Sequence, residues 1–192
     1  MRHRVLLTTS VVAGLLANCA CGNPTVDDVP AAAAAPPAKP DPNGFDRTLS
    51  MPLPNASLAQ LQDTFSQGRG SERRHEATDI AAPLGTPVLA VDDGVIRKLF
   101  LSKPGGLTIY QFDPTNRFCY YYAHLNAYVP GLKEEMNVTR GQVIGYVGVS
   151  GNAPPQSPHL HFGINILGPE KKWHGGTPID PFPYLVAALK KR

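Results

Sequence analysis

The segment His159-Leu-His-Phe-Gly-Ile-Asn-Ile166 decides the fold class of this chain. Hydrophobic residues alternate with histidines at its start, and side chains at positions i and i+2 of a β-strand project to the same side. We therefore expect a strand in which Leu160 and Phe162 point into a core, while His159 and His161 face a groove.

Similar runs precede this strand, and each is short, rich in Val, Ile, Tyr or Phe, and bounded by turn residues. They are Thr86–Val91, Gly94–Leu101, Leu107–Phe112, Phe118–His124 and Val143–Val147. Because no long helical pattern separates these runs, the sequence predicts an all-β fold, mainly an antiparallel sheet or sandwich with a groove.

Two short helices are expected at the ends of this β-region. Ser57 has the position of an N-cap for a short N-terminal helix through Leu61 and Phe65. A C-terminal helix is expected after Asp180, with residues 184–189 as its body.

Two seven-residue segments share one residue pattern. Gly85–Val91 and Gly141–Val147 share their first glycine, a Val or Ile at the fourth position and a valine at the seventh. Matching seven-residue strands can arise by chance, and two related β-units would also fit. With related units, the expected fold is of the duplicated-hybrid-motif type.

The N-terminus has the pattern of an export signal. Arg2 and Arg4 precede thirteen largely apolar residues, 5–17, and this stretch is too short to span a bilayer comfortably. Cys19 ends a lipobox-like segment, although Asn18 stands where lipoboxes prefer Gly, Ala or Ser. We expect residues 1–18 to be a signal peptide, and the protein to be exported to the periplasm or cell envelope. A lipid on Cys19 would anchor it to the membrane.

Residues 19–50 are expected to form a flexible linker. The stretch from Gly22 to Pro54 holds eight of the twenty prolines and little hydrophobic material that could be buried. The folded domain is then expected over residues 51–192, as a monomer.

The charge balance argues against nucleic acid as a partner. Two of the eighteen basic residues, Arg2 and Arg4, lie in the export signal, which leaves sixteen basic against fifteen acidic residues, a net charge of +1. A nucleic-acid-binding surface would need a clustered basic face.

Four of the six histidines and one aspartate fall in three short motifs. These are His75 and Asp79 in HEATD, His124 in YYYAHL, and His159 and His161 in PHLHF. Imidazole and carboxylate are zinc ligands, and three protein ligands with an open fourth position make a catalytic zinc site. Five candidates therefore suggest three ligands and two further imidazoles, without showing which is which.

Together these motifs resemble the lysostaphin/LytM/β-lytic zinc metallopeptidases, which cut peptidoglycan. The flanking sequences DIAAPLGTPVLA, YYAHL, GQVIGYVGVSGN and PHLHF carry the resemblance, over about residues 60–185. It implies that His75, Asp79 and His161 bind one zinc ion and that His124 and His159 are catalytic. One departure is Ala77, at a position where many members have glycine, and we expect no loss of zinc binding from it.

The resemblance implies a zinc-dependent endopeptidase that hydrolyses peptide bonds in peptidoglycan. Zinc lowers the pKa of its bound water, and His124 and His159 are then candidates for moving protons. Tyr122, two residues before His124, is expected on the same strand face and would contact the substrate.

Two alternatives belong to other classes. A non-catalytic LytM-like envelope domain would bind peptidoglycan or activate cell-wall amidases, but such domains typically lack zinc or catalytic residues. A lipoyl- or biotinyl-carrier domain would need a lysine at an exposed hairpin turn, and the turn at residues 91–94 has none. Cys119 is expected to be a buried thiol, with a disulfide to Cys21 as the alternative.

Overall fold

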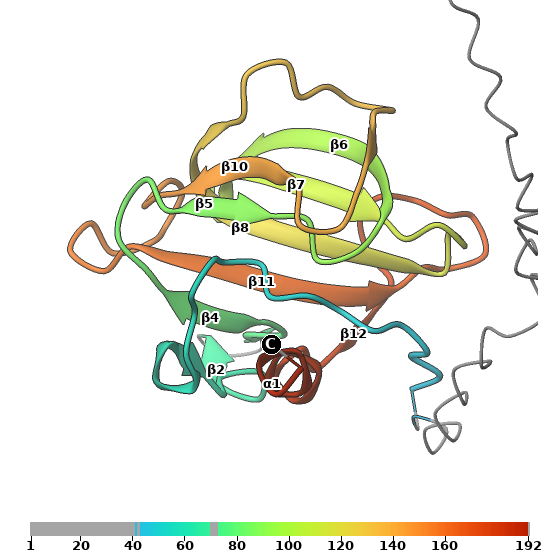
Figure 1. Cartoon of the computed structure of the whole chain (residues 1–192), viewed down its shortest axis with the longest axis horizontal. Helices are drawn as coiled ribbons and strands as arrows, with labels where there is room; N and C mark the ends of the chain where they lie inside the picture. Colours follow the sequence, from blue (N-terminus) through green and yellow to red (C-terminus); the bar gives the residue numbers. More distant parts are fainter. Residues whose placement is uncertain (1–40, 42, 70–72, 192) are drawn as a thin grey trace, which may run out of the picture. The chain divides into compact units, whose positions relative to one another are not determined.

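The computed structural model describes residues 41, 43–69 and 73–191 (Figure 1). The expected signal peptide, the lipidation candidate Cys19 and most of the expected linker lie outside the described residues. Within these residues no helix has both the length and the hydrophobicity that crossing a bilayer requires.

The described residues contain one large antiparallel sheet of ten strands. Its main path runs β1 (Leu61–Gln62), β4 (Thr78–Ala81), β11 (His159–Ile166), β8 (Phe118–Tyr128), β7 (Gly106–Phe112), β6 (Gly94–Ser102) and β9 (Asn137–Val138). Strand β10 (Val143–Val147) pairs with β8 and with β5 (Pro87–Leu89), and β12 (Thr177–Ile179) pairs with β11. A separate hairpin joins β2 (Gly68–Arg69) and β3 (Arg73–Arg74). The predicted antiparallel β-fold is confirmed.

The expected C-terminal helix is present as α1 (Phe182–Leu189). The expected N-terminal helix is confirmed only at its start: Ser57 is the N-cap, but a single 3₁₀ turn, η1 (Leu58–Gln60), follows it, and no helix extends through Leu61 and Phe65. The side chain of Gln60 donates a hydrogen bond to Ala81 O (3.0 Å), and Leu61 already pairs with Ile80 of β4. Strand pairing therefore ends the helical turn.

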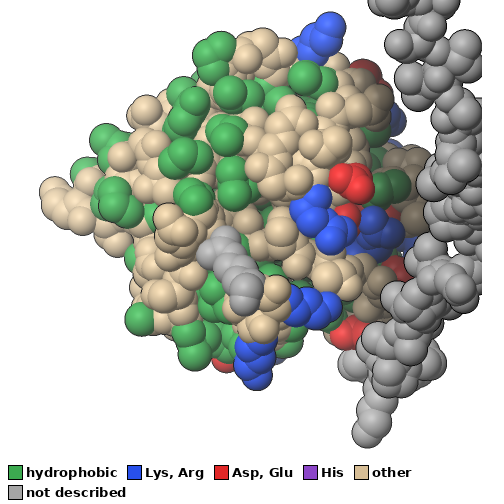
Figure 2. Space-filling model, in the orientation of Figure 1, with side chains coloured by type: hydrophobic (Ala, Val, Ile, Leu, Met, Phe, Trp, Pro, Cys, Tyr) green, Lys and Arg blue, Asp and Glu red, His purple; other side chains and the backbone are tan. Residues whose placement is uncertain are grey.

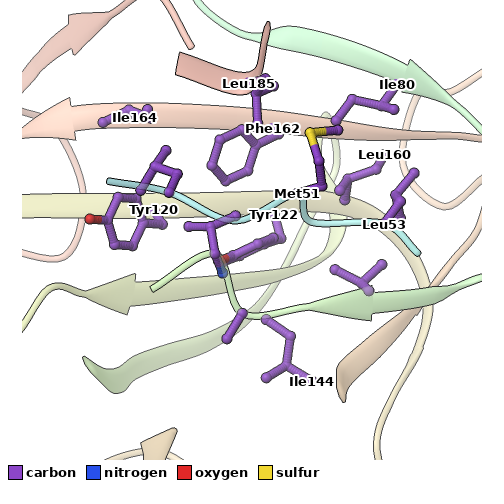
Figure 3. Close-up of a cluster of buried hydrophobic side chains, with 14 of the residues drawn as sticks. Met51, Leu53, Ile80, Tyr120, Tyr122, Ile144, Leu160, Phe162, Ile164 and Leu185 are labelled. Atoms are coloured by element: carbon purple, nitrogen blue, oxygen red, sulfur yellow. The ribbon is translucent and has the colours of Figure 1, made fainter. Parts of the chain in front are cut away.

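The hydrophobic core lies on one face of β8 and β11 (Figure 3). Its largest fully buried side chains include Met51, Leu53, Ile80, Tyr120, Tyr122, Leu125, Ile144 and Phe162. Leu160 and Phe162 of β11 point into this core, as the alternation in the sequence predicted.

The packed part of the chain begins before Met51, the expected start of the domain. Phe45 and Leu49 are each only 5% exposed and belong to the core. Phe45 packs against Phe118 and against Tyr184 of α1, with ring centroids 4.7 and 4.4 Å apart. We call residues 43–57 the N-terminal strap; in Figure 1 this segment crosses in front of β11.

Ion pairs attach the strap to the sheet. Arg47 bonds the buried carboxylate of Asp92 (2.7 Å), which Arg140 also contacts (2.6 Å), and Arg117 pairs with Asp46 at the surface (2.7 Å). Basic and acidic side chains also adjoin on part of the face shown in Figure 2. Opposite charges thus hold separate segments of the chain together.

The two repeated segments pair with each other. β5 and β10 form an antiparallel ladder in which Val88 is opposite Gly145 and Leu89 opposite Val143. Each segment starts at a glycine with almost the same left-handed conformation, φ 81° at Gly85 and φ 82° at Gly141. The repeat in the sequence is therefore also a repeat in the backbone.

Candidate functional site

His75 reaches the site from a loop that leads into β4. Its N–H donates to Gln67 O (2.8 Å), and the next residue, Glu76, has φ 57° and donates to Phe65 O (3.0 Å). Ala77 follows and is buried, so the left-handed residue of the motif is Glu76 and not Ala77. This turn leads the chain from His75 into strand β4.

Asp79 and His161 lie directly opposite each other on β4 and β11. Side chains of directly paired residues project to the same face of an antiparallel sheet, with Cβ atoms about 5 Å apart. The sheet register therefore sets the distance between these two groups.

Three donor atoms converge at this point. Asp79 Oδ1 lies 3.1 Å from His75 Nε2 and 3.0 Å from His161 Nδ1, and the two nitrogens are 2.9 Å apart. Two imidazole nitrogens and one carboxylate oxygen form a donor set that zinc accepts, with bonds of about 2.0–2.2 Å. This spacing fits three ligands of one tetrahedral ion, and His75, Asp79 and His161 are the residues that could hold it.

The charge of Asp79 is retained despite its burial. Burial alone would raise the pKa of its carboxyl group, but hydrogen bonds and charge from His161 and His75 lower the pKa far below its usual value. The group is therefore an anion at neutral pH, as a metal ligand must be.

His124 and His159 lie beside these three residues. The His124 ring is 4.9 Å from the His159 ring and 5.4 Å from the His161 ring, and His159 Nε2 is 3.8 Å from Asp79 Oδ1. The structure therefore brings together all five site residues that the sequence singled out.

The two flanking imidazoles are oriented in the same way. His124 Nδ1 lies 2.8 Å from Ser150 O, and His159 Nδ1 lies 2.8 Å from Ser157 O. A carbonyl oxygen only accepts, so each Nδ1 carries a proton, and the neutral form of either ring has its unprotonated nitrogen at Nε2. Burial lowers the pKa of His124 to about 4, against the opposing effect of the Ser150 carbonyl.

A groove of about 270 Å³ opens beside these side chains. Its lining combines three of the site residues with polar and small side chains from strands β1 and β4 and from two loops: Gln62, Thr64, Gln67, Asp79, Ala81, His124, Asn152, Ala153, Pro154, Ser157 and His159. The groove thus offers hydrogen-bonding groups to a chain lying across the site.

Tyr122 does not face the site, contrary to the sequence-based expectation. Its side chain is fully buried in the core, where its hydroxyl donates to Gln111 Oε1 (2.8 Å) and accepts from Val91 N (3.0 Å). The register of β7 and β8 shifts between Leu107 and Ile109, which adds one residue to β8 just after Tyr122. This β-bulge reverses the alternation of side chains before His124.

Tyr121 is the aromatic residue that lies near the site. Its ring centroid is 5.8 Å from that of His161 and 4.8 Å from that of Tyr110. Regular alternation, which puts Tyr122 on the face of His124, would put Tyr121 on the opposite face, and the sequence carries no signal for the bulge. The remaining described histidine, His174, is exposed and packs against Trp173, away from the motifs.

The comparisons with known proteins identify the family of this chain. The profile of peptidase family M23 matches residues 73–181, more than half of the chain. Among curated proteins, an L-Ala--D-Glu endopeptidase of Bacillus subtilis is 37% identical over 145 residues, which cover 72% of this chain and 43% of that protein. The DD-carboxypeptidase/endopeptidase Mpg of Neisseria meningitidis is 38% identical over 110 residues, 57% of this chain and 22% of that protein.

Solved structures show the same fold. The catalytic domain of lysostaphin from Staphylococcus simulans aligns with a TM-score of 0.52 and 31% identity, over 59% of this chain and 80% of that domain. A putative glycyl-glycine endopeptidase lytM from Ruminococcus gnavus aligns with a TM-score of 0.60 and 29% identity, over 76% of this chain and 60% of the other. This chain spans less than half the length of the two curated relatives above. With the matched region extending from just before His75 to just past β12, the chain belongs to peptidase family M23.

Proposed function

We propose that this domain is a zinc-dependent endopeptidase that hydrolyses peptide bonds in peptidoglycan. The convergence of His75 Nε2, Asp79 Oδ1 and His161 Nδ1 within about 3 Å of one another, with two further imidazoles beside them, carries this proposal. A bound zinc ion would supply a water molecule of lowered pKa and would polarise the carbonyl of the scissile bond. A non-catalytic role is not favoured, because all five side chains are assembled.

The three proposed ligands have distinct tasks. Asp79 brings the negative charge that partly compensates a divalent cation, and its lowered pKa keeps it ionised. His75 and His161 contribute imidazole nitrogens, and the side chain of His75 is almost fully buried, which restricts its rotation. The rigid pairing of β4 with β11 holds Asp79 and His161 in place.

We propose that His124 and His159 move protons during hydrolysis. Each ring donates its Nδ1 proton to a backbone carbonyl and leaves Nε2 free to accept a proton. In the protonated state Nε2 becomes a donor, which can stabilise negative charge on the carbonyl oxygen or protonate the leaving amine. Because burial lowers the pKa of His124 to about 4, this ring is neutral before the reaction and suits a proton acceptor.

The substrate class follows from the relatives. The curated proteins that match this chain include an L-Ala--D-Glu endopeptidase, a peptidoglycan DD-endopeptidase and lysostaphin. These names support peptidoglycan as the substrate without selecting one bond. An enzyme of this kind works in the cell envelope, so we also propose that residues 1–18 direct export and that Cys19 carries a lipid.

The division between ligands and proton carriers can be tested with two variants. His161→Ala should lose both zinc and hydrolysis, whereas His124→Ala should keep zinc and lose turnover by about 10²-fold or more. Metal analysis of the purified proteins and release of soluble muropeptides from purified cell wall measure the two effects. Equal loss of zinc in both variants would contradict the assignment.

The substrate proposal has its own test. Zinc-loaded protein should release new soluble fragments from defined peptidoglycans, and a chelator should stop the release. Mass spectrometry of the fragments identifies the bond that is cut. If zinc-loaded wild-type protein releases none from any of these walls, the endopeptidase proposal is wrong.

A further inference from the structure

Ser150 lies at a junction of three backbone segments around His124. Its hydroxyl donates to Leu125 O of β8 (2.7 Å) and accepts from Leu107 N of β7 (3.0 Å). Its carbonyl oxygen accepts the Nδ1 proton of His124 (2.8 Å). One residue therefore contacts both strands at the bulge and the imidazole that the bulge presents.

The bulge itself needs this support. Leu107 and Leu125 are the paired residues at the bulge, and the serine hydroxyl bridges the N–H of one and the carbonyl of the other. His124 has φ 60°, an uncommon conformation for a residue with a side chain, and its N–H donates to Gly105 O outside the ladder. Such a conformation persists only where the surroundings fix it, and it is a frequent feature of functional sites.

The loop that carries Ser150 is held by close contact with a second turn. A Cβ atom on Gly106 would lie 2.1 Å from Ser150 Oγ, and one on Gly151 would lie 2.3 Å from Gly106 N. The N–H of Asn152 also donates to Pro104 O (3.0 Å). Since neither glycine leaves room for a side chain, the position of Ser150 relative to the bulge is fixed by backbone packing.

We propose that Ser150 is a positioning residue for His124. Its hydroxyl stabilises the bulge that turns His124 toward His159 and His161, and its carbonyl selects the tautomer that bears the proton on Nδ1. Nε2 is then the reactive nitrogen of the ring. This inference rests on the proposed peptidase function only for its kinetic consequence, since the tautomer exists without substrate.

The test compares wild type with Ser150→Ala, Ser150→Cys and Ser150→Thr. Ser150→Ala should lower kcat by about 10- to 100-fold and leave KM and zinc content within about twofold of wild type. Two-bond ¹H–¹⁵N correlations of the histidine rings should show a single Nδ1–H tautomer for His124 in wild type and a mixture in the alanine variant. Ser150→Thr keeps the hydroxyl, so its kcat and its His124 tautomer should both match those of wild type.

Ser50→Ala is the matched control. It also removes a hydroxyl that bonds to strand-end carbonyls, those of Ala90 and Val91, but these belong to the strap contact and not to the site. It should lower the melting temperature without changing kcat or the His124 tautomer. If Ser150→Ala does not fold, the near-isosteric Ser150→Cys replaces it, because a thiol is a weak hydrogen-bonding group.

The possible outcomes separate the two proposals. A wild-type tautomer in both the alanine and the cysteine variant would overturn the positioning role, whatever happens to kcat. Absence of hydrolysis by zinc-loaded wild type would overturn the proposed function alone, because the NMR measurement still decides the role of Ser150.

Discussion

His124 illustrates how much depends on a single residue conformation. Its φ of 60° belongs to the extra residue of the β7–β8 bulge, and this extra residue puts Tyr122 in the core and Tyr121 beside His161. Without the bulge the alternation of β8 would turn Tyr122 and His124 to one face. The conformation of one residue thus decides which aromatic side chain lies near the groove.

The buried position of Tyr122 predicts the effect of removing its hydroxyl. Tyr122→Phe leaves Gln111 Oε1 and Val91 N without this partner, so the free energy of unfolding should fall by about 1–3 kcal/mol. The KM for cell-wall substrate should stay unchanged. Denaturant unfolding and steady-state kinetics measure these effects.

Tyr146→Phe provides a comparison for this prediction. The same change at a partly exposed tyrosine should alter the free energy of unfolding by no more than about 0.5 kcal/mol. A raised KM in the folded Tyr122→Phe protein would mean that Tyr122 contacts the substrate after all.

At the scale of elements, Asp92 joins three parts of the chain. It follows β5 and bonds Arg47 of the strap, Arg140 before β10 and the hydroxyl of Tyr120 in β8 (3.0 Å). Its side chain has no exposed surface. Burial would raise the pKa of this carboxyl group, but the two guanidinium groups and the tyrosine hydroxyl lower it below the usual value.

This network predicts how stability depends on pH. Because the folded pKa of Asp92 lies below the unfolded value of about 3.9, its contribution is complete above that pH and is lost as the pH falls toward the folded pKa. Asp92→Asn should lower the free energy of unfolding by about 3 kcal/mol at pH 7 and flatten its decline below pH 4. Urea unfolding at several pH values measures both.

Asp46→Asn is the matched control for the Asp92 variant. Asp46 also pairs with an arginine, Arg117, but both side chains are largely exposed, so the loss should stay below about 1 kcal/mol. Equal losses in the two variants would contradict the importance of the buried network.

The sequence predicted the regular elements well and the irregular ones poorly. Strands such as β10 and β11 follow from their composition and from the turns that bound them. The helix expected after Ser57 stops after one 3₁₀ turn because Leu61 pairs with a strand residue about twenty positions later, in β4, and a local pattern contains no such information. The bulge at His124 depends on Ser150 and Gly105, which are also distant in sequence.

At the scale of the whole molecule, the strap is part of the folded domain. Composition marked the residues before 51 as linker, since the stretch from Gly22 to Pro54 holds eight prolines and little hydrophobic material. These two hydrophobic side chains enter the core, and the backbone of Ser50 bonds to Val91 O (2.8 Å). The site motifs, by contrast, could be predicted because their residues are close in sequence and chemically distinctive.

Removal of the strap should lower the stability of the domain. A chain that starts at residue 51 should unfold at a much lower temperature than one that starts at residue 41, because it lacks Phe45, Leu49 and the Arg47–Asp92 pair. Phe45→Ala alone should lower the free energy of unfolding by about 3–5 kcal/mol. Thermal unfolding by circular dichroism compares these proteins.

Leu58→Ala is the control for this prediction. Leu58 is 56% exposed, so its truncation should change stability by no more than about 0.5 kcal/mol. Equal melting temperatures of the chains starting at 41 and 51 would show that the strap does not contribute to the fold.

The pairing of β5 with β10 has a further meaning when it is viewed as symmetry. Gly85 N donates to Val147 O and Gly141 N donates to Ala90 O, each at 2.8 Å. The first glycine of each repeated segment thus donates a hydrogen bond to the end of the other segment. The two contacts differ by one residue: Gly85 bonds to the seventh residue of the other segment and Gly141 to the sixth. The register of the β5–β10 ladder shifts between Val143 and Gly145, which accounts for this difference. The arrangement approximates the isologous contact of a two-fold dimer, but it joins two segments of one chain.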